Sequence, residues 1–245
     1  MIKIITIITK FIIAALMALL FSSCNPSFNL GNGIKGSGNL TTETRVADQD
    51  FKSIEVSSGI KVFVEQADIK SITVETDDNL QEHIITKIEN GVLKIEANKG
   101  YNSTTPMVRV KMPVINGLSA SSGSKINSSY TLTSNNINAN SSSGSLINID
   151  IEADAITLES SSGSEIEARG KALKLETNSS SGSHINAKAL MANEVFSQSS
   201  SGSSTSVYPI LKLDAKVSSG SSIDYYKVPK TLSKDISSGG SIDEK

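Results

Sequence analysis

The stretch that decides the fold is "LESSSGSEIE", which runs from Leu158 to Glu167 and recurs in near-copies through the second half of the chain. Its centre is the triplet Ser-Ser-Gly. Such triplets end at Gly59, Gly123, Gly144, Gly163, Gly182, Gly202, Gly220 and Gly239. From Gly123 onward, consecutive glycines are 18 to 21 residues apart. A flexible linker has no reason to keep such a period, so the triplets mark a structural repeat.

Apolar columns accompany the triplets. Three residues after the glycine stand Ile126, Ile147, Ile166, Ile185, Thr205, Ile223 and Ile242. Seven residues before it, from the second repeat on, stand Ile137, Ile156, Leu175, Val195, Leu213 and Leu232. Apolar and polar residues alternate between the columns, as expected of strands with one buried face. The pattern predicts an all-β fold, a parallel β-helix with coils of about 19 residues spaced about 4.8 Å apart.

The Ser-Ser-Gly triplet is predicted to be the corner between two strands of a coil. Glycine adopts positive φ without a steric penalty, and small serines permit a tight turn in which stacked hydroxyls can satisfy one another.

From the apolar ladder we expect Ile166→Asp to unfold or aggregate the protein, because it strands a carboxylate inside the ladder. Ser164→Ala should be nearly silent by comparison.

The β-helix is expected to cover residues 119–245, and a β-rich region over 45–118 is expected to cap one end of it. Asn90-Gly91 between two apolar runs is a strong hairpin signal. A brief helical turn is expected near Asn79, leading into the hairpin. The alternative is a short helix over residues 78–89.

The N-terminal residues 1–23 have the pattern of a secretory signal. Lys3 and Lys10 precede an apolar run over residues 11–21, and two small serines follow it. This order of a basic start, a short apolar segment and small residues before a cut is typical of an exported protein. The apolar run is too short to span a bilayer comfortably.

Cys24 is the only cysteine, so no intramolecular disulfide can form. The sequence "LLFSSC" ending at Cys24 is similar to a bacterial lipobox, which implies a lipidated first residue of the mature protein. Asn25 is not the aspartate that holds some lipoproteins at the inner membrane, and this favours the outer membrane. Residues 24–44 are expected to be a flexible tether. The alternative is an ordinary signal peptide with an incidental cysteine.

The chain resembles the head GIN-domain auto-transporter adhesin family of bacterial, largely Bacteroidetes, secreted lipoproteins. The resemblance is carried by "GNGIKGSGN" at 31–39, "FKSIEVSSGIKVFVEQ" at 51–66, "TDDNLQEHIITKIENGVLKIEA" at 76–97 and the serial Ser-Gly-Ser coils. It extends over residues 31–245. It implies a right-handed parallel β-helix, adhesion at the cell envelope, and no catalytic residues to be carried over.

A polar column is the candidate binding site. Four residues after each glycine stand Asn127, Asn148, Glu167, Asn186, Ser206, Asp224 and Asp243. If the neighbouring isoleucines point inward, these residues point outward. The resulting stripe could engage an extended glycan or a protein strand at the surface. The alternative is an ordinary solvated face, because outward strand positions must be polar anyway.

The functional classes can be ranked from charge and residue types. The formal net charge is -2 without any concentration of lysine or arginine, which argues against nucleic acid as a partner. We predict no catalytic, cofactor-binding or metal-binding residues, and hence no enzyme. The predicted function is a lipid-anchored envelope adhesin or binding module, with the membrane and glycans or surface proteins as partners. One alternative is a polysaccharide-active enzyme, whose candidate carboxylates would be Glu159, Glu165 and Glu167, because these cluster near one coil. The other alternative is a purely structural spacer in the envelope.

Overall fold

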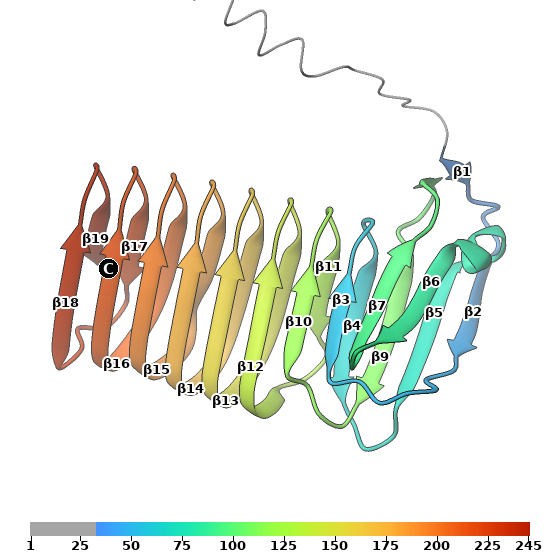
Figure 1. Cartoon of the computed structure of the whole chain (residues 1–245), viewed down its shortest axis with the longest axis horizontal. Helices are drawn as coiled ribbons and strands as arrows, with labels where there is room; N and C mark the ends of the chain where they lie inside the picture. Colours follow the sequence, from blue (N-terminus) through green and yellow to red (C-terminus); the bar gives the residue numbers. More distant parts are fainter. Residues whose placement is uncertain (1–32) are drawn as a thin grey trace, which may run out of the picture. The chain divides into compact units, whose positions relative to one another are not determined.

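The computed structural model describes residues 33–245, and these residues form one continuous β structure (Figure 1). The predicted signal segment 1–23 and Cys24 lie outside the described residues. Among residues 33–245, no helix has the length and apolar character needed to cross a membrane.

The body of the structure is a stack of parallel coils, as predicted. Its strands are β10 Gly117–Ala120, β11 Lys125–Ser128, β12 Leu132–Ser141, β13 Leu146–Ser160, β14 Glu165–Ser179, β15 His184–Ser199, β16 Ser204–Val217, β17 Ser222–Tyr225, β18 Thr231–Ile236 and β19 Ser241–Glu244. The coils run up one side to a corner and down behind it (Figure 1). We call the strand segments that follow the corners face A and those that precede them face B.

The apolar columns form ladders between the two faces. On face A, Ile147 pairs with Ile166 and Ile166 with Ile185, and all three are fully buried. On face B, Ile156 pairs with Leu175. A buried aliphatic side chain contributes about 1.5–3 kcal/mol, so each coil adds several such increments to a shared core. The β-solenoid fold predicted from the period is confirmed.

Each Ser-Ser-Gly triplet forms a tight turn at the corner, as predicted. Ser164 N donates to Ser161 O at 3.3 Å across the turn. Gly163 has a φ of 68°, and Ser162 before it also has a positive φ, of 55°. Two successive residues with positive φ define a type I′ turn, which suits a tight reversal between strands. The sequence predicted the glycine conformation but not the left-handed serine.

The serine after each glycine is a buried structural group, which argues against the expectation that Ser164→Ala is nearly silent. Ser164 is only 2% exposed. Its Oγ lies 2.7 Å from both Ser161 O and Ser141 O, the second on the preceding coil, and accepts from Ser161 N at 3.1 Å. The hydroxyls therefore satisfy mainly backbone groups rather than one another. Ser124, Ser145, Ser183, Ser203 and Ser221 make the same link to the preceding coil.

The solenoid begins earlier in the chain than residue 119. Strands β3 Ser53–Val56 and β4 Lys61–Gln66 stack in parallel on β10 and β11, with Ile54 beside Leu118 and Val62 beside Ile126. The triplet that ends at Gly59 is thus a true corner. About 50 residues are inserted between β4 and β10, so the spacing from Gly59 to Gly123 departs from the period of the other triplets. In space, however, this coil stacks on the next one without a gap.

The inserted segment closes the end of the stack. Strands β7 Val92–Ala97 and β9 Met107–Met112 add one more parallel level, and β5 Ser71–Asp77 and β6 Ile84–Glu89 then pair antiparallel to it. Asn90 and Gly91, both with positive φ, form the predicted hairpin turn between β6 and β7. Hydrogen bonds from Lys87 and Lys94 lower the pKa of Glu89, beside this turn, to about 2.

Two expectations for the N-terminal region are settled by its short elements. A 3-10 helix, η1 Asp78–His83, matches the expected helical turn, whereas the alternative helix over 78–89 is wrong because β6 occupies its second half. The expected tether differs from the structure after residue 33. Strand β1 Ile34–Lys35 pairs with β8 Tyr101–Asn102, and β2 Leu40–Arg45 pairs with β5. The backbone groups of a polar segment can thus be satisfied by a sheet edge that the sequence does not reveal.

Candidate functional site

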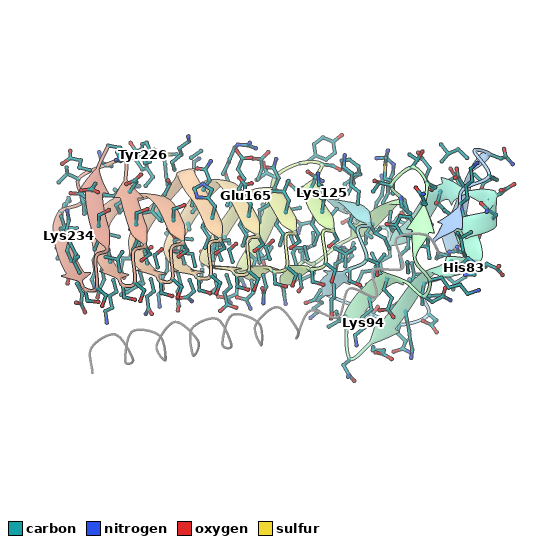
Figure 2. The ribbon with its side chains drawn as sticks, turned by 90° about the horizontal axis from the view of Figure 1, so that it is seen from above. His83, Lys94, Lys125, Glu165, Tyr226 and Lys234 are labelled. Atoms are coloured by element: carbon teal, nitrogen blue, oxygen red, sulfur yellow. The ribbon has the colours of Figure 1, made fainter. Side chains whose placement is uncertain are left out.

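The predicted stripe exists as one column of face A. The ladder register places Asn127, Asn148, Glu167, Asn186, Ser206, Asp224 and Asp243 beside one another in successive coils. Two residues earlier in each coil, Lys125 and Glu165 mark the same side of the structure (Figure 2). The linear column expected of the stripe is therefore present.

Three residues of this stripe, Asn148, Glu167 and Asp224, have side-chain partners within the chain. Arg169 donates to Asn148 Oδ1 at 3.2 Å and to Glu167 Oε1 at 2.7 Å. Lys245 Nζ lies 3.5 Å from Asp224 Oδ1. Ser206 is 9% exposed, and the Nδ2 atom of Asn127 is buried without a partner among the described residues. A ligand on face A would have to compete with Arg169 for the central groups.

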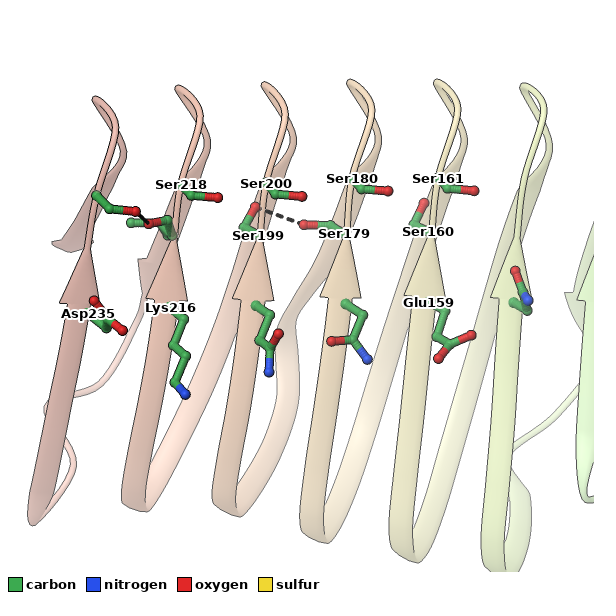
Figure 3. A pocket seen from close by; sticks show the side chains of 15 residues that line it. Glu159, Ser160, Ser161, Ser179, Ser180, Ser199, Ser200, Lys216, Ser218 and Asp235 are labelled. Atoms are coloured by element: carbon green, nitrogen blue, oxygen red, sulfur yellow. Dashed lines mark hydrogen bonds between the residues drawn. The ribbon is translucent and has the colours of Figure 1, made fainter.

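A groove of about 540 Å³ lies on face B, beside the corners (Figure 3). Two rows of polar side chains line most of it. The first, which we call the polar row, consists of Asn140, Glu159, Asn178, Gln198, Lys216 and Asp235. The second, which we call the serine row, consists of Ser161, Ser180, Ser200, Ser218 and Ser237.

Strand alternation places the two rows side by side. Within one coil, Glu159 and Ser161 point outward while Ser160 between them is buried. The register then stacks equivalent residues, so that Asn178 pairs with Glu159 and with Gln198. Each coil of the groove from Glu159 to Asp235 therefore presents one longer polar side chain and one hydroxyl, and the coil of Asn140 adds one further amide. The labelled side chains of the serine row point in one direction, as Figure 3 shows.

The groups of the groove are free to bind. Among residues 33–245, no hydrogen bond or ion pair engages a side chain of the polar row. In the serine row, only Ser237 donates its hydroxyl within the chain, to Val217 O at 3.3 Å. Exposed amides, carboxylates and hydroxyls without internal partners can exchange water for ligand at little cost, unlike the groups held by Arg169 on face A.

Sequence reasoning missed the groove, although a signal for it was present. The polar row stands four residues before each glycine, and the serine row is the first serine of each triplet. Both positions follow from the alternation that predicted the stripe on the other side of the corner. The predicted binding column lies four residues after each glycine, on the opposite side of the corner from the groove.

The acidic and histidine side chains do not converge on one centre. Glu159 lies on face B, whereas Glu165 and Glu167 lie on face A beyond the corner. His184 Nδ1 is 2.7 Å from Ser204 Oγ, its ladder neighbour. Within the described part of the chain, no group of three or more His, Cys, Asp or Glu side chains is placed to hold a metal ion.

A second hollow, of about 670 Å³, lies where the coils bend away from the corners. Leu173 and Met191 line it and are 56% and 40% exposed, beside polar residues such as Asn135 and Asp154. Gly170, close to this bend, has a φ of 122°. The bends differ from coil to coil, as the register shift between Glu167 and Arg169 shows. This side therefore lacks the regular repetition of the groove.

Comparisons with known proteins agree with the geometry of the fold. A family model described as "Putative auto-transporter adhesin, head GIN domain" matches residues 50–229. A "putative adhesin" from Bacteroides fragilis superposes with a TM-score of 0.80 at 20% identity, covering 87% of this chain and 100% of that one. A "putative adhesin" from Parabacteroides merdae has a TM-score of 0.72 at 18% identity, covering 88% and 100%.

A third solved structure is similar in fold but carries a different name. It is a "Putative lipid binding protein" from Parabacteroides distasonis, with a TM-score of 0.71 at 22% identity, covering 86% of this chain and 99% of that chain. No curated protein matches the sequence. At these identities the structural likenesses establish the fold alone.

Proposed function

This chain belongs to the head GIN domain family of auto-transporter adhesins, and on that premise we propose that it is a cell-envelope adhesin that holds an extended polymer in the face-B groove. The observation that carries the proposal is the pair of polar rows, which repeats in each coil from Glu159 to Asp235 and in which Ser237 alone has a side-chain hydrogen bond among the described residues. Repeated groups in line fit a repeating ligand.

The form of the groove favours a polymer over a small molecule. Small-molecule sites are usually enclosed and mostly apolar, with a few polar groups that fix orientation. Here Val217 is the apolar residue among serines, amides and charged side chains of the lining. The polar row also extends over five coil steps, or about 24 Å at the usual strand spacing.

The carboxylates of the groove support binding rather than hydrolysis. Glu159 and Asp235 are separated by four coil steps, which is about 19 Å. Paired-acid glycosidases place their two carboxyl groups about 5–9.5 Å apart. Incubation with bacterial and host polysaccharides, followed by measurement of new reducing ends, tests the enzymatic alternative. Their appearance would contradict this part of the proposal.

The test of the binding surface compares the two faces with matched variants. Asn178→Ala with Gln198→Ala removes two free amides from the groove, and Asn148→Ala with Asn186→Ala removes two amides from the stripe. Protein-coated beads are allowed to settle on polysaccharide-coated and cell surfaces, and retention under flow is counted. We expect only the groove variant to lose retention. Loss confined to the stripe variant would move the site to face A.

Attachment to the membrane is the second part of the proposal. Cys24, outside the described residues, is proposed to carry the lipid and to hold the protein at the outer membrane. Its support is the sequence similarity of residues 19–24 to a lipobox. Cys24→Ala should abolish incorporation of labelled palmitate and release the protein into the soluble fraction. Continued membrane fractionation of the unlabelled variant would overturn this part.

A further inference from the structure

We infer that the occupant of the groove is an uncharged, extended polysaccharide, bound with one sugar unit per coil. The inference rests on the proposed function, and it adds the chemical class of the ligand and its register. Three features of the described residues carry it: the spacing of the rows, the kind of groups in them, and their charge.

The spacing selects the kind of polymer. Successive members of the polar row are one coil apart, about 4.8 Å. A pyranose unit in a chain linked through equatorial bonds is close in length to the height of one coil, and successive units are turned over by about half a turn. Such a sugar chain lying along the groove keeps one unit beside each coil and presents the same ring orientation to every second coil. An extended peptide repeats its side-chain direction every two residues, or about 6.8 Å, and falls out of phase within two coils.

The groups of the two rows match hydroxyl-rich rings. Asn178, Gln198 and Asn140 each offer a donor and an acceptor, so that one amide can bind two neighbouring sugar hydroxyls. The serine row adds a hydroxyl in each of the coils from Ser161 to Ser237, on the corner side of the groove. From Glu159 to Asp235, each sugar unit thus meets one longer polar side chain and one serine hydroxyl.

The aromatic side chain nearest to the groove is already covered. Phe196 lies two residues before Gln198 on face B, and Lys174 and Lys212 stand over its ring at 5.0 and 4.7 Å. Stacking of a sugar on this ring would have to displace a lysine. Binding therefore depends on hydrogen bonds that are individually weak, and affinity must accumulate along the chain.

The charges of the groove argue against an anionic polymer. The polar row contains Glu159 and Asp235 but only one cation, Lys216. A polyanion such as a uronic-acid chain would meet net repulsion. For an uncharged chain, the affinity should hardly change between low and high salt, because no ion pair is formed.

The experiment is calorimetric titration of the purified mature protein with oligosaccharides of increasing length. The probes are β-1,4-linked glucose and N-acetylglucosamine oligomers from dimer to octamer. We expect the affinity to rise about threefold with each added unit and to level off near about six units, the number of rungs in the polar row. Asn178→Ala with Gln198→Ala should reduce hexamer affinity about tenfold, whereas Asn148→Ala with Asn186→Ala should leave it unchanged.

Two further probes separate the failure of this inference from failure of the proposed function. One is an extended acidic polysaccharide, and the other is an extended, uncharged peptide. The wild-type protein could bind one of these two probes, and the groove variant could fail to bind it. That result would overturn the inference of an uncharged glycan but would keep the groove as the adhesive surface. Equal affinity for dimer and hexamer would overturn the register of one unit per coil. Adhesion that the groove variant leaves intact would overturn the proposed function itself.

Discussion

At the scale of single residues, the three serines of a corner have different structural roles although they are the same residue type. Ser161 lies half-buried in the groove, Ser162 takes the left-handed conformation, and Ser164 is buried and bonded to the preceding coil. The sequence repeat predicted that a corner exists, but it did not predict these separate structural roles. They depend on a neighbouring coil about 20 residues away, which local sequence rules do not describe.

The buried serine gives the first residue-scale prediction. Ser164→Ala should lower the free energy of unfolding by about 0.5–1.5 kcal/mol, because the hydrogen bonds of its Oγ to Ser161 O and Ser141 O are lost while Ser161 N stays bonded to Ser141 O. Urea denaturation followed by circular dichroism measures the change.

A neighbouring serine provides the control for this measurement. Ser161→Ala removes an unbonded, half-buried hydroxyl and should change stability by less than about 0.5 kcal/mol. Equal losses in the two variants would show that the hydroxyl of Ser164 does not join the coils.

At the scale of elements, each ladder is held by identical contacts between consecutive strands. Ile166 on β14 is fully buried between Ile147 on β13 and Ile185 on β15. Ile166→Asp should therefore destabilise the protein by about 4 kcal/mol or more, since a carboxylate at this position has no cation or water. Ile166→Val should lose only about 1 kcal/mol. The measurement is the urea concentration at the midpoint of unfolding, with the far-ultraviolet circular dichroism signal of each variant. Similar midpoints for the two variants would contradict a buried ladder position for residue 166.

Period and alternation predicted the individual ladders well, but they did not predict how the two faces meet. The isoleucine column is interrupted at Thr205, which sequence alone leaves unexplained. In the structure, Thr205 Oγ1 lies 2.8 Å from Ser179 Oγ, and Ser179 also contacts Ser199 at 2.8 Å. A polar position on one face is thus matched by serines on the other. Such pairing across the core has no fixed separation in the sequence.

At the scale of the whole chain, the same limitation explains both larger differences from the sequence prediction. The coil of β3 and β4 was assigned to the cap because the insertion after Gln66 separates it in sequence from its neighbour β10. The groove was not predicted because the sequence does not show which outward groups keep internal partners in the folded chain. Family membership and the regular period fix the fold, while the ligand surface follows from which outward groups remain unpaired.

Since each coil contacts mainly its two neighbours, one coil should be removable without loss of the fold. Deleting residues 164–182 removes one period of 19 residues and joins Gly163 to Ser183, which restores the sequence Ser-Ser-Gly-Ser. Ile185 can then stack on Ile147, and the polar row loses one rung, Asn178. We expect cooperative unfolding to persist and the oligosaccharide length at which affinity levels off to fall from about six units to about five.

A deletion of half a coil is the matched control. Removing residues 164–172 joins the corner at Gly163 to Leu173, so inward and outward positions of the following coils can no longer align. This variant should not fold. If both deletions unfold the protein, the coils are not independent units. If the shorter solenoid folds but still levels off near six units, the sugar register does not follow the coils.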